Sequence, residues 1–375
     1  MRAEHVIRFQ GLVTHPNRRV AALATGLLIL GGALIGGAYV ALLGPTLALA
    51  GAAAIVGGLL MLQSVQWGLI FLIGISTLLP FAALPFKVGF TPTFLDLVQL
   101  GVFFVWLAKF ATRREKHFTA SPIGLPVAVF LGLALFAFAR GMSYSRPTAN
   151  TLRHFVEIII SIALFFVVVN SMRTRQQLDW LVRMLILGGV GAAAIGVLFY
   201  AIPEAWTVRA LNALGRLNYP GGYGALRYIE DDPRNPMRAI GTAVDPNVLG
   251  GMLIFLTTVA AAQFAAPYPL FRRLWLVPML ALQGLCLYLT YSRSSLLGLA
   301  AALGVLALLR YRRLLLIGIV AAGLLLLLPQ AQGYVAHLIA GLQGQDRATQ
   351  MRFGEYKDAL TLITRYPWFG VGFSG

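Results

Sequence analysis

Three arginine-bearing segments hold the residues of this chain that could do chemistry. Arg238 stands in RAIGTAVDPN just before a long apolar run, and Arg293 stands in TYSRSS between two apolar runs. Arg352 stands in a charged segment near the C-terminus. A guanidinium group presents a planar fork of N–H donors that binds phosphate or carboxylate groups in bidentate fashion. The three arginines therefore favour a site for an anion of the phosphate class.

The segment around Arg238 also has a purely structural interpretation. Asp245 can cap a helix that begins at Pro246, and Gly241 can mark a turn before it. Capping does not explain Arg238 or Asn247. We therefore expect Asp245 and Asn247 to support Arg238 at a helix entrance, where helix N–H groups face the same anion.

The segment around Arg293 has two interpretations as well. Ser292 or Ser294 can cap a helix, and the Arg293 side chain can extend to the membrane interface. Alternatively, Arg293 lies low in the outer leaflet, where an arginine is costly unless it is partnered. A lipid-linked diphosphate is a suitable partner, and Ser292 would then support the site.

The segment around Arg352 predicts a helix over 350–365 with one apolar face. Phe353, Tyr356, Leu360 and Ile363 recur at helical spacing, and a segment rich in aromatic residues and glycine follows. This pattern is typical of a helix that lies on a membrane surface. A packed interfacial helix without chemistry has the same pattern.

Weaker candidates lie elsewhere in the chain. The acidic run 230–232 could bind a hard cation, but a solvated turn is the simpler interpretation. Asp96, His154 and Glu157 border or enter apolar runs, where ionisable residues are functional candidates, although His154 and Glu157 could pair with each other or with Arg153. No zinc-protease, P-loop, dinucleotide-binding or catalytic-triad pattern is present.

Composition limits what kind of protein can carry these residues. Hydrophobic residues make up 58% of the 375 positions, charged residues 11%, and the mean hydropathy is +0.78. These values exclude a soluble globular enzyme and a disordered chain. The lone Cys286 excludes a disulfide framework and a thiolate metal site. The net charge of +17 arises from cations between apolar runs, which indicates membrane topology and not nucleic-acid binding.

Apolar runs predict an all-α, polytopic integral membrane protein with about eleven transmembrane helices. Each run is long enough, or nearly so, to cross about 30 Å of hydrocarbon. The runs span 21–44, 45–65, 67–86, 92–109, 122–140, 156–170, 184–202, 248–266, 274–291, 294–309 and 314–329.

Basic residues that flank these runs predict the orientation. Five clusters of Arg and Lys lie tight against span ends on one side, which places the N-terminus in the cytoplasm. The chain then divides into transmembrane helices one to seven (1–202), an outer loop (203–247), helices eight to eleven (248–329) and the start of a large outer loop with an interfacial helix (330–375). Arg238, Arg293 and Arg352 all fall on the outer side.

The three arginine-bearing segments resemble those of the O-antigen ligase and polymerase superfamily. Residues 238–247 look like the family's R-x-x-G-T…D-P-N element, and residues 290–295 look like its S-R-S/G element. Residues 352–372, which end in YPWFGVG, look like its R…P…G-V-G element and are the most specific of the three. The resemblance covers the chain from about Pro203 to its end.

This resemblance implies a GT-C-type glycosyltransferase of the bacterial inner membrane whose active face is periplasmic. The donor would be a glycan on undecaprenyl diphosphate, and the acceptor a glycan or lipid A-core. Membrane lipids would surround the protein, and no nucleic acid, metal or cofactor is implied. By position, Arg238, Arg293 and Arg352 would hold the diphosphate. The D-P-N element favours a polymerase over a ligase.

The chain departs from the family at its end. Family members continue into a His-Asn element and further spans, whereas this sequence stops at Gly375. His337 precedes the G-V-G element and is not the matching histidine. We therefore expect a fragment whose catalytic histidine lies beyond Gly375, or else a product that lacks this base. A lipid or polysaccharide transporter or flippase, and a non-catalytic accessory membrane protein, are the alternative functions.

Overall fold

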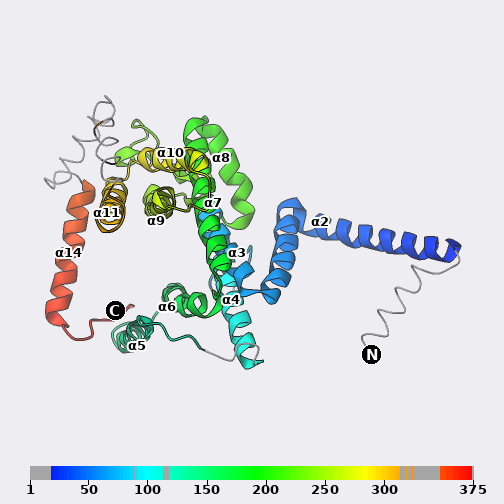
Figure 1. Cartoon of the computed structure of the whole chain (residues 1–375), viewed down its shortest axis with the longest axis horizontal. Helices are drawn as coiled ribbons and strands as arrows, with labels where there is room; N and C mark the ends of the chain where they lie inside the picture. The colour runs from blue at the N-terminus through cyan, green and yellow to red at the C-terminus, as the bar shows by residue number, and fades with distance from the viewer. Residues whose placement is uncertain are drawn as a thin grey trace. The chain divides into compact units, whose positions relative to one another are not determined.

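The described part of the chain is built from helices (Figure 1). The computed structural model describes residues 18–87, 89–112, 118–312, 318, 323 and 347–373. His337 and nearly all of the predicted span 314–329 lie outside these residues. The chain forms two compact units, Met1–Leu59 and Leu60–Gly375. Within the described ranges the only β-type pairings are isolated bridges, Ala83 with Thr93 and Tyr228 with Met237.

Six helices among the described residues are long and apolar enough to cross a membrane. They are Val20–Leu42, Phe94–Ala111, Gly124–Gly141, Ala149–Ser171, Arg175–Ala201 and Pro246–Ala265. Ala54–Gln63, Val65–Leu78, Arg273–Leu289 and Arg293–Leu309 are apolar but shorter. The prediction of an all-α, polytopic membrane protein is therefore confirmed, whereas the count of eleven spans is not supported.

The helices follow one another along the chain with few long connections. They are α2 (Arg18–Gln63), α3 (Val65–Leu78), α4 (Phe94–Ala111), α5 (Gly124–Gly141), α6 (Ala149–Ser171), α7 (Arg175–Ala201), α8 (Glu204–Ala213), α9 (Pro246–Ala265), α10 (Arg273–Leu289), α11 (Arg293–Leu309) and α14 (Arg347–Arg365). Four 3-10 turns, η1 (Leu214–Leu217), η2 (Tyr223–Ala225), η3 (Ile229–Asp231) and η4 (Gly241–Ala243), lie between α8 and α9.

Several helix ends differ from the apolar runs for local reasons. In α2 the helix breaks at Gly44, whose φ is +74°, and Pro45 follows, which is the predicted boundary between the first two runs. α6 and α7 begin well before the predicted 156 and 184. The first turns of both helices are polar, so a search for apolar residues does not detect them. The N-cap side chains of Thr148 and Thr174 accept hydrogen bonds from N–H groups of these turns.

Helix α7 is the central element of the second unit, and one face of it consists of small residues. Gly188 and Gly189 lie so close to their neighbours that a Cβ at Gly189 would be 2.9 Å from the Leu256 Cβ on α9. A Cβ at Gly196 would be 2.6 Å from the Cys286 sulfur on α10. Small residues of this kind allow helices to approach closely where lipid provides no hydrophobic driving force.

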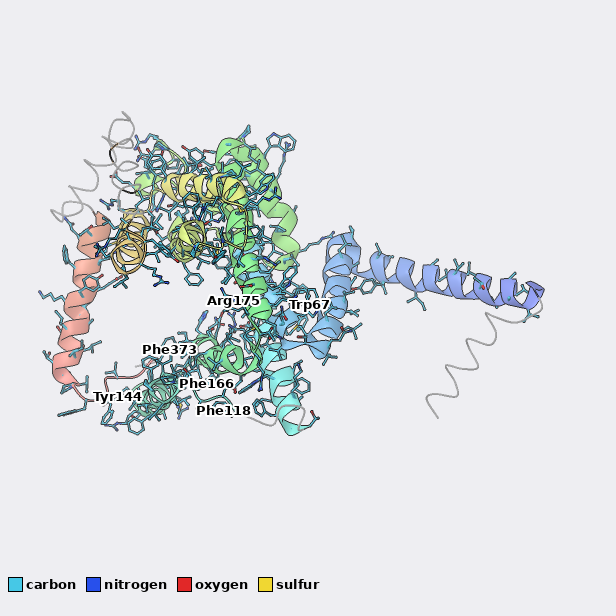
Figure 2. The ribbon with its side chains drawn as sticks, viewed as in Figure 1. Trp67, Phe118, Tyr144, Phe166, Arg175 and Phe373 are labelled. Carbon is cyan, nitrogen blue, oxygen red and sulfur yellow. The ribbon has the colours of Figure 1, made fainter. Side chains whose placement is uncertain are left out.

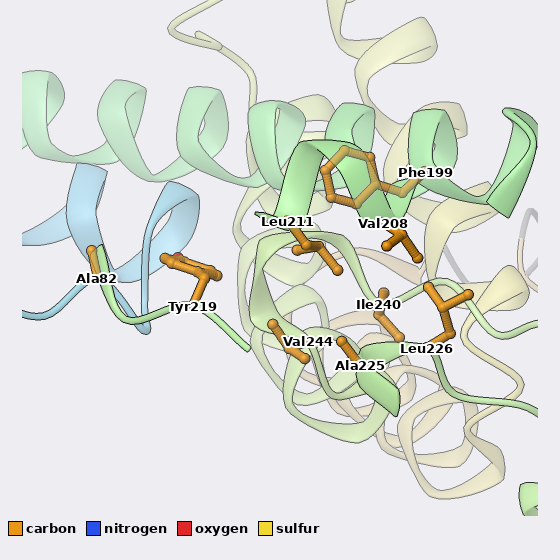
Figure 3. Close-up of a cluster of buried hydrophobic side chains, with 9 residues drawn as sticks. All are labelled: Ala82, Phe199, Val208, Leu211, Tyr219, Ala225, Leu226, Ile240 and Val244. Carbon is orange, nitrogen blue, oxygen red and sulfur yellow. The ribbon is translucent and has the colours of Figure 1, made fainter. Parts of the chain in front are cut away.

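The predicted outer loop is a folded layer with its own core. Phe199 from α7, Leu211 from α8 and Ile240 from the end of the loop are buried together with Ala82, Val208, Tyr219, Ala225, Leu226 and Val244 (Figure 3). The Ala83 N–H donates to the Leu217 carbonyl over 2.9 Å, which ties the layer to the segment after α3. This layer positions Arg238 above the entrance of α9.

Replacing Gly189 with alanine is expected to lower the melting temperature of the detergent-solubilised protein. The new methyl group would press on the Leu256 Cβ and lie 3.2 Å from the Gln283 Nε2. Overpacking costs about 1–3 kcal/mol, which exceeds the roughly 1 kcal/mol by which alanine favours a helix over glycine. Gly251→Ala is the matched control, because a Cβ there meets nothing within 4 Å. Equal melting temperatures for the two variants would contradict the tight packing of α7 on α9.

Candidate functional site

The backbone before α9 runs through a buried, strained path. The Arg238 N–H donates to the Arg227 carbonyl over 2.7 Å, and the Ala239 N–H donates to the Leu289 carbonyl at the end of α10 over 2.8 Å. The chain from Ala239 to Val244 is buried. Val244 has a φ of +53°, which is unusual for a β-branched residue and costs on the order of 1–3 kcal/mol. Strain of this kind persists only where the surrounding packing enforces it.

Asp245 caps α9, as the capping interpretation predicts. Its Oδ1 accepts hydrogen bonds from the N–H groups of Asn247 at 2.7 Å and Val248 at 3.0 Å, and Pro246 occupies the first turn. These two N–H groups are therefore engaged by the Asp245 carboxylate and do not face an external anion. The positive charge available at this helix entrance comes from Arg238 instead.

The Arg238 side chain joins α9 to the end of α10. Its Nε donates to the Thr290 carbonyl over 2.8 Å, and one terminal nitrogen donates to the Asn247 Oδ1 over 3.1 Å. Arg238 is half-buried, whereas Asn247 is exposed. Two contacts on different nitrogens fix the plane of the guanidinium group. The residues around Arg238 were recognised from the sequence, but the Thr290 carbonyl was not.

A chain of hydroxyl groups stabilises the turn before Arg293. Thr290 Oγ1 donates to the Leu287 carbonyl over 2.6 Å and accepts from the Ser292 N–H at 3.2 Å, while Ser295 Oγ donates to Ser292 Oγ over 2.8 Å. Thr290, Ser292 and Ser295 are buried, with at most 4% of each exposed. Tyr291 between them has a φ of +50°. Ser292 is thus the N-cap of α11 by position, but its hydroxyl stabilises the turn rather than a helix N–H group.

Arg293 is the first residue of α11 and is half-buried. Arg293 lies three residues after Thr290, whose carbonyl accepts a hydrogen bond from Arg238. The hydroxyl network holds the turn between Thr290 and Arg293. α11 packs closely on α9 here, because a Cβ at Gly250 would collide with the Ser295 hydroxyl. The structure therefore brings Arg238, Asp245, Asn247, Ser292 and Arg293 to one region, where α9, α10 and α11 meet.

Arg352 belongs to a different element. α14 begins slightly before the predicted helix 350–365 and ends at Arg365 as predicted. Every residue from Met351 to Arg365 is exposed. The contacts described above for the Arg238 region come from residues 227–295. The role of Arg352 stays a prediction.

A second charged cluster ties α6 to α4. Arg153 donates through Nε to the Asp96 Oδ2 at 3.1 Å, and one of its terminal nitrogens is 3.0 Å from the same oxygen. Glu157 lies 3.6 Å from Arg153 and 3.5 Å from the His154 Nδ1. Asp96 also forms a capping box with Thr93. Both pairings considered from the sequence therefore occur within α6, and the Arg153–Asp96 pair joins α6 to α4.

The acidic run 230–232 forms a turn. Asp232 accepts two hydrogen bonds from Arg234 Nε, each at 3.1 Å, and a third from an Nη at 2.9 Å. These bonds hold the pKa of Asp232 below its usual range. An engaged carboxylate fits the solvated-turn interpretation. Across the described ranges, no group of three or more His, Cys, Asp or Glu side chains is placed to hold a metal ion.

Comparison with known proteins gives one match. Residues 278–375 match the family described as O-antigen ligase. The matched range contains the turn 290–295 and the segment 352–372, whereas Arg238 lies upstream of it. The comparisons with curated proteins and with solved structures gave no match. The match covers 98 of the 375 residues and confirms, for this range, the resemblance to the O-antigen ligase and polymerase superfamily.

Proposed function

We propose that this chain binds the lipid carrier in a membrane glycosyltransferase that moves a glycan from undecaprenyl diphosphate to a glycan or lipid acceptor. The family match supports a role in polysaccharide assembly in general terms. The observation that carries the finer proposal is the fixed guanidinium of Arg238, held by the Asn247 side chain and by the carbonyl of Thr290, three residues before Arg293. Two arginines at adjoining helix ends are suited to a diphosphate, which carries several anionic oxygens.

In this proposal the site faces the outer side of the bacterial inner membrane, and the N-terminus lies in the cytoplasm. Arg238 stands where a folded loop layer meets α9, and Arg293 stands at the start of α11. Both arginines therefore lie at ends of apolar helices. The diphosphate of a lipid carrier would sit at such a level, with its polyprenyl tail in the hydrocarbon.

The reaction proposed is an inverting displacement at the anomeric carbon of the donor glycan. The acceptor hydroxyl oxygen forms the new bond to this carbon, and the bond from the carbon to the diphosphate oxygen breaks with its electron pair on the diphosphate. Arg238 and Arg293 stabilise the charge that develops there. The hydroxyl proton passes to a general base, which is not assigned to a described residue. A polymerase fits the D-P-N element better than a ligase does.

Removing either arginine cation is expected to lower glycan transfer strongly. Loss of one donor that stabilises a developing anion typically lowers kcat by a factor of about 10²–10³. We therefore expect Arg238→Ala and Arg293→Ala each to lower kcat by a factor in this range. Lysine at either position should recover only part of the rate, because an ammonium group cannot reproduce the fork. The measurement is glycan transfer from a lipid-linked donor by the full protein in membrane vesicles.

Arg234→Ala is the matched control for these variants. Arg234 lies in the same loop layer, is 91% exposed and pairs with Asp232. We expect Arg234→Ala to transfer glycan at the wild-type rate. The assignment of Arg238 and Arg293 is wrong if their alanine variants are as active as Arg234→Ala at equal amounts of protein in the membrane.

Substitutions at Asn247 are expected to distinguish the effect of the orientation of Arg238 on donor binding from the effect of its charge. Asn247→Ala removes one hydrogen-bond acceptor and should raise KM for the donor about tenfold. Tenfold corresponds to about 1.4 kcal/mol, close to the lower end of the about 1.5–3 kcal/mol that a hydrogen bond to a charged group contributes. Asn247→Asp should raise KM further, because a carboxylate neutralises the cation although it binds it more tightly. Steady-state kinetics with varied donor measure this order. An aspartate variant that binds the donor better than the alanine variant would show that Arg238 is only structural.

A further inference from the structure

The segment after α14 contacts the C-terminal end of α5 and the N-terminal end of α6 through three aromatic pairs. Tyr366 lies edge-on to Tyr144 with 5.4 Å between ring centroids, and Phe369 lies edge-on to Phe136 at 5.1 Å. The third pair, Phe373 with Phe155 on α6, has centroids 5.6 Å apart. Figure 2 labels Tyr144 and Phe373 in this region, and Figure 1 shows the segment that follows α14 beside α5 and α6.

Two glycines allow the backbones to meet at the centre of this contact. A Cβ at Gly372 would lie 2.5 Å from the Ala137 carbonyl oxygen and 2.6 Å from the Gly141 Cα. A Cβ at Gly141 would in turn lie 2.7 Å from the Val371 carbonyl oxygen. Gly372 also has a φ of +78°, which disfavours any side chain. Both sides of the contact therefore require glycine for steric reasons.

Most of α14 is exposed. Its residues from Met351 to Arg365 are exposed, including the apolar Phe353 and Leu360. The helix is followed immediately by the segment whose residues make these contacts, Tyr366, Phe369, Gly372 and Phe373. Arg352 is fourteen residues before Tyr366, which is about 21 Å at 1.5 Å per residue. A change in the contact would therefore not touch Arg352 directly.

We propose that residues 366–373 form a latch that docks on α5 and α6 through Gly141 and Gly372 and thereby positions α14 and Arg352 for the diphosphate. Gly141 and Gly372 are positioning residues in this proposal, and their effect on catalysis rests on the proposed function. The exposed Trp368, 87% of which is accessible, lies inside the segment but takes no part in the three aromatic pairs. The G-V-G element is thus a docking element and not a ligand for the substrate.

Cysteine crosslinking tests the docking without reference to activity. Cys286 is the only cysteine in residues 1–375, so the test starts from the full protein in which Cys286 and any cysteine outside these residues are replaced by alanine. The pair Phe136→Cys with Phe369→Cys should react with a short, reducible bifunctional thiol reagent in native membranes. The control pair Leu125→Cys with Phe369→Cys should not, because Leu125 lies eleven residues, about 16 Å, farther along α5. Equal crosslinking of both pairs would overturn the docking.

Glycine substitutions then test the role of the backbone contact. Gly141→Ala or Gly372→Ala should lower the crosslinking yield of the Phe136–Phe369 cysteine pair several-fold. Gly132→Ala, on the same helix, should not, because a Cβ there meets nothing within 4 Å. A yield that is unchanged in Gly141→Ala and Gly372→Ala would overturn the proposal that the two glycines form the joint.

Restoring glycan transfer with the crosslink tests whether the latch acts by positioning α14 and Arg352. In the Gly372→Ala background with the cysteine pair, KM for the lipid-linked donor should rise more than kcat falls. Closing the crosslink should restore transfer, and reduction should return it to the lowered level. Failure of the closed crosslink to restore transfer would overturn the positioning role. If Arg352→Ala leaves transfer unchanged while the crosslinking pattern holds, the diphosphate assignment of Arg352 fails and the docking stands.

Discussion

The hydrogen bonds of Arg238 join the parts of the chain on which the site depends. Thr290 ends α10, so its carbonyl is one of those that have no partner within the helix, and the Arg238 Nε donates to it. Asp245, from the same short segment, occupies N–H groups at the start of α9. A cation therefore lies at the C-terminal end of α10 and an anion at the N-terminal end of α9, which favours both helix dipoles.

This arrangement requires α7, α9 and α10 to lie unusually close together. Gly189 and Gly196 supply the space, and the buried residues of the loop layer close over the same end of α7. Because Gly241 packs on the backbone of Gly196, the turn that leads to Asp245 rests directly on α7. The left-handed conformations of Val244 and Tyr291 are maintained by this packing. Rigid support on both sides of Arg238 is what a preorganised anion site requires.

Features with local causes could be predicted from the sequence, and features with distant causes could not. Asp245 as a cap and the helix over 350–365 were predicted, because capping residues and periodicity act within one or two turns. The contact of Arg238 with Thr290 joins residues 52 positions apart and has no sequence signal. The docking of Gly372 on Gly141 was also not predicted. Each position requires glycine only because the backbone around the other glycine lies so close. The short α3 ends at Leu78, before Pro80, although the apolar run continues to 86.

Direct binding of undecaprenyl diphosphate to the purified full protein tests the central claim without the transfer reaction. Native mass spectrometry in detergent would compare the wild type, Arg238→Ala and the loop-layer control Arg234→Ala at matched lipid concentrations, with undecaprenol as the lipid that lacks the diphosphate. We expect the wild type and Arg234→Ala to bind the diphosphate lipid in preference to undecaprenol, and Arg238→Ala to lose this preference. An undiminished preference in Arg238→Ala would contradict a diphosphate site at the junction of α9, α10 and α11.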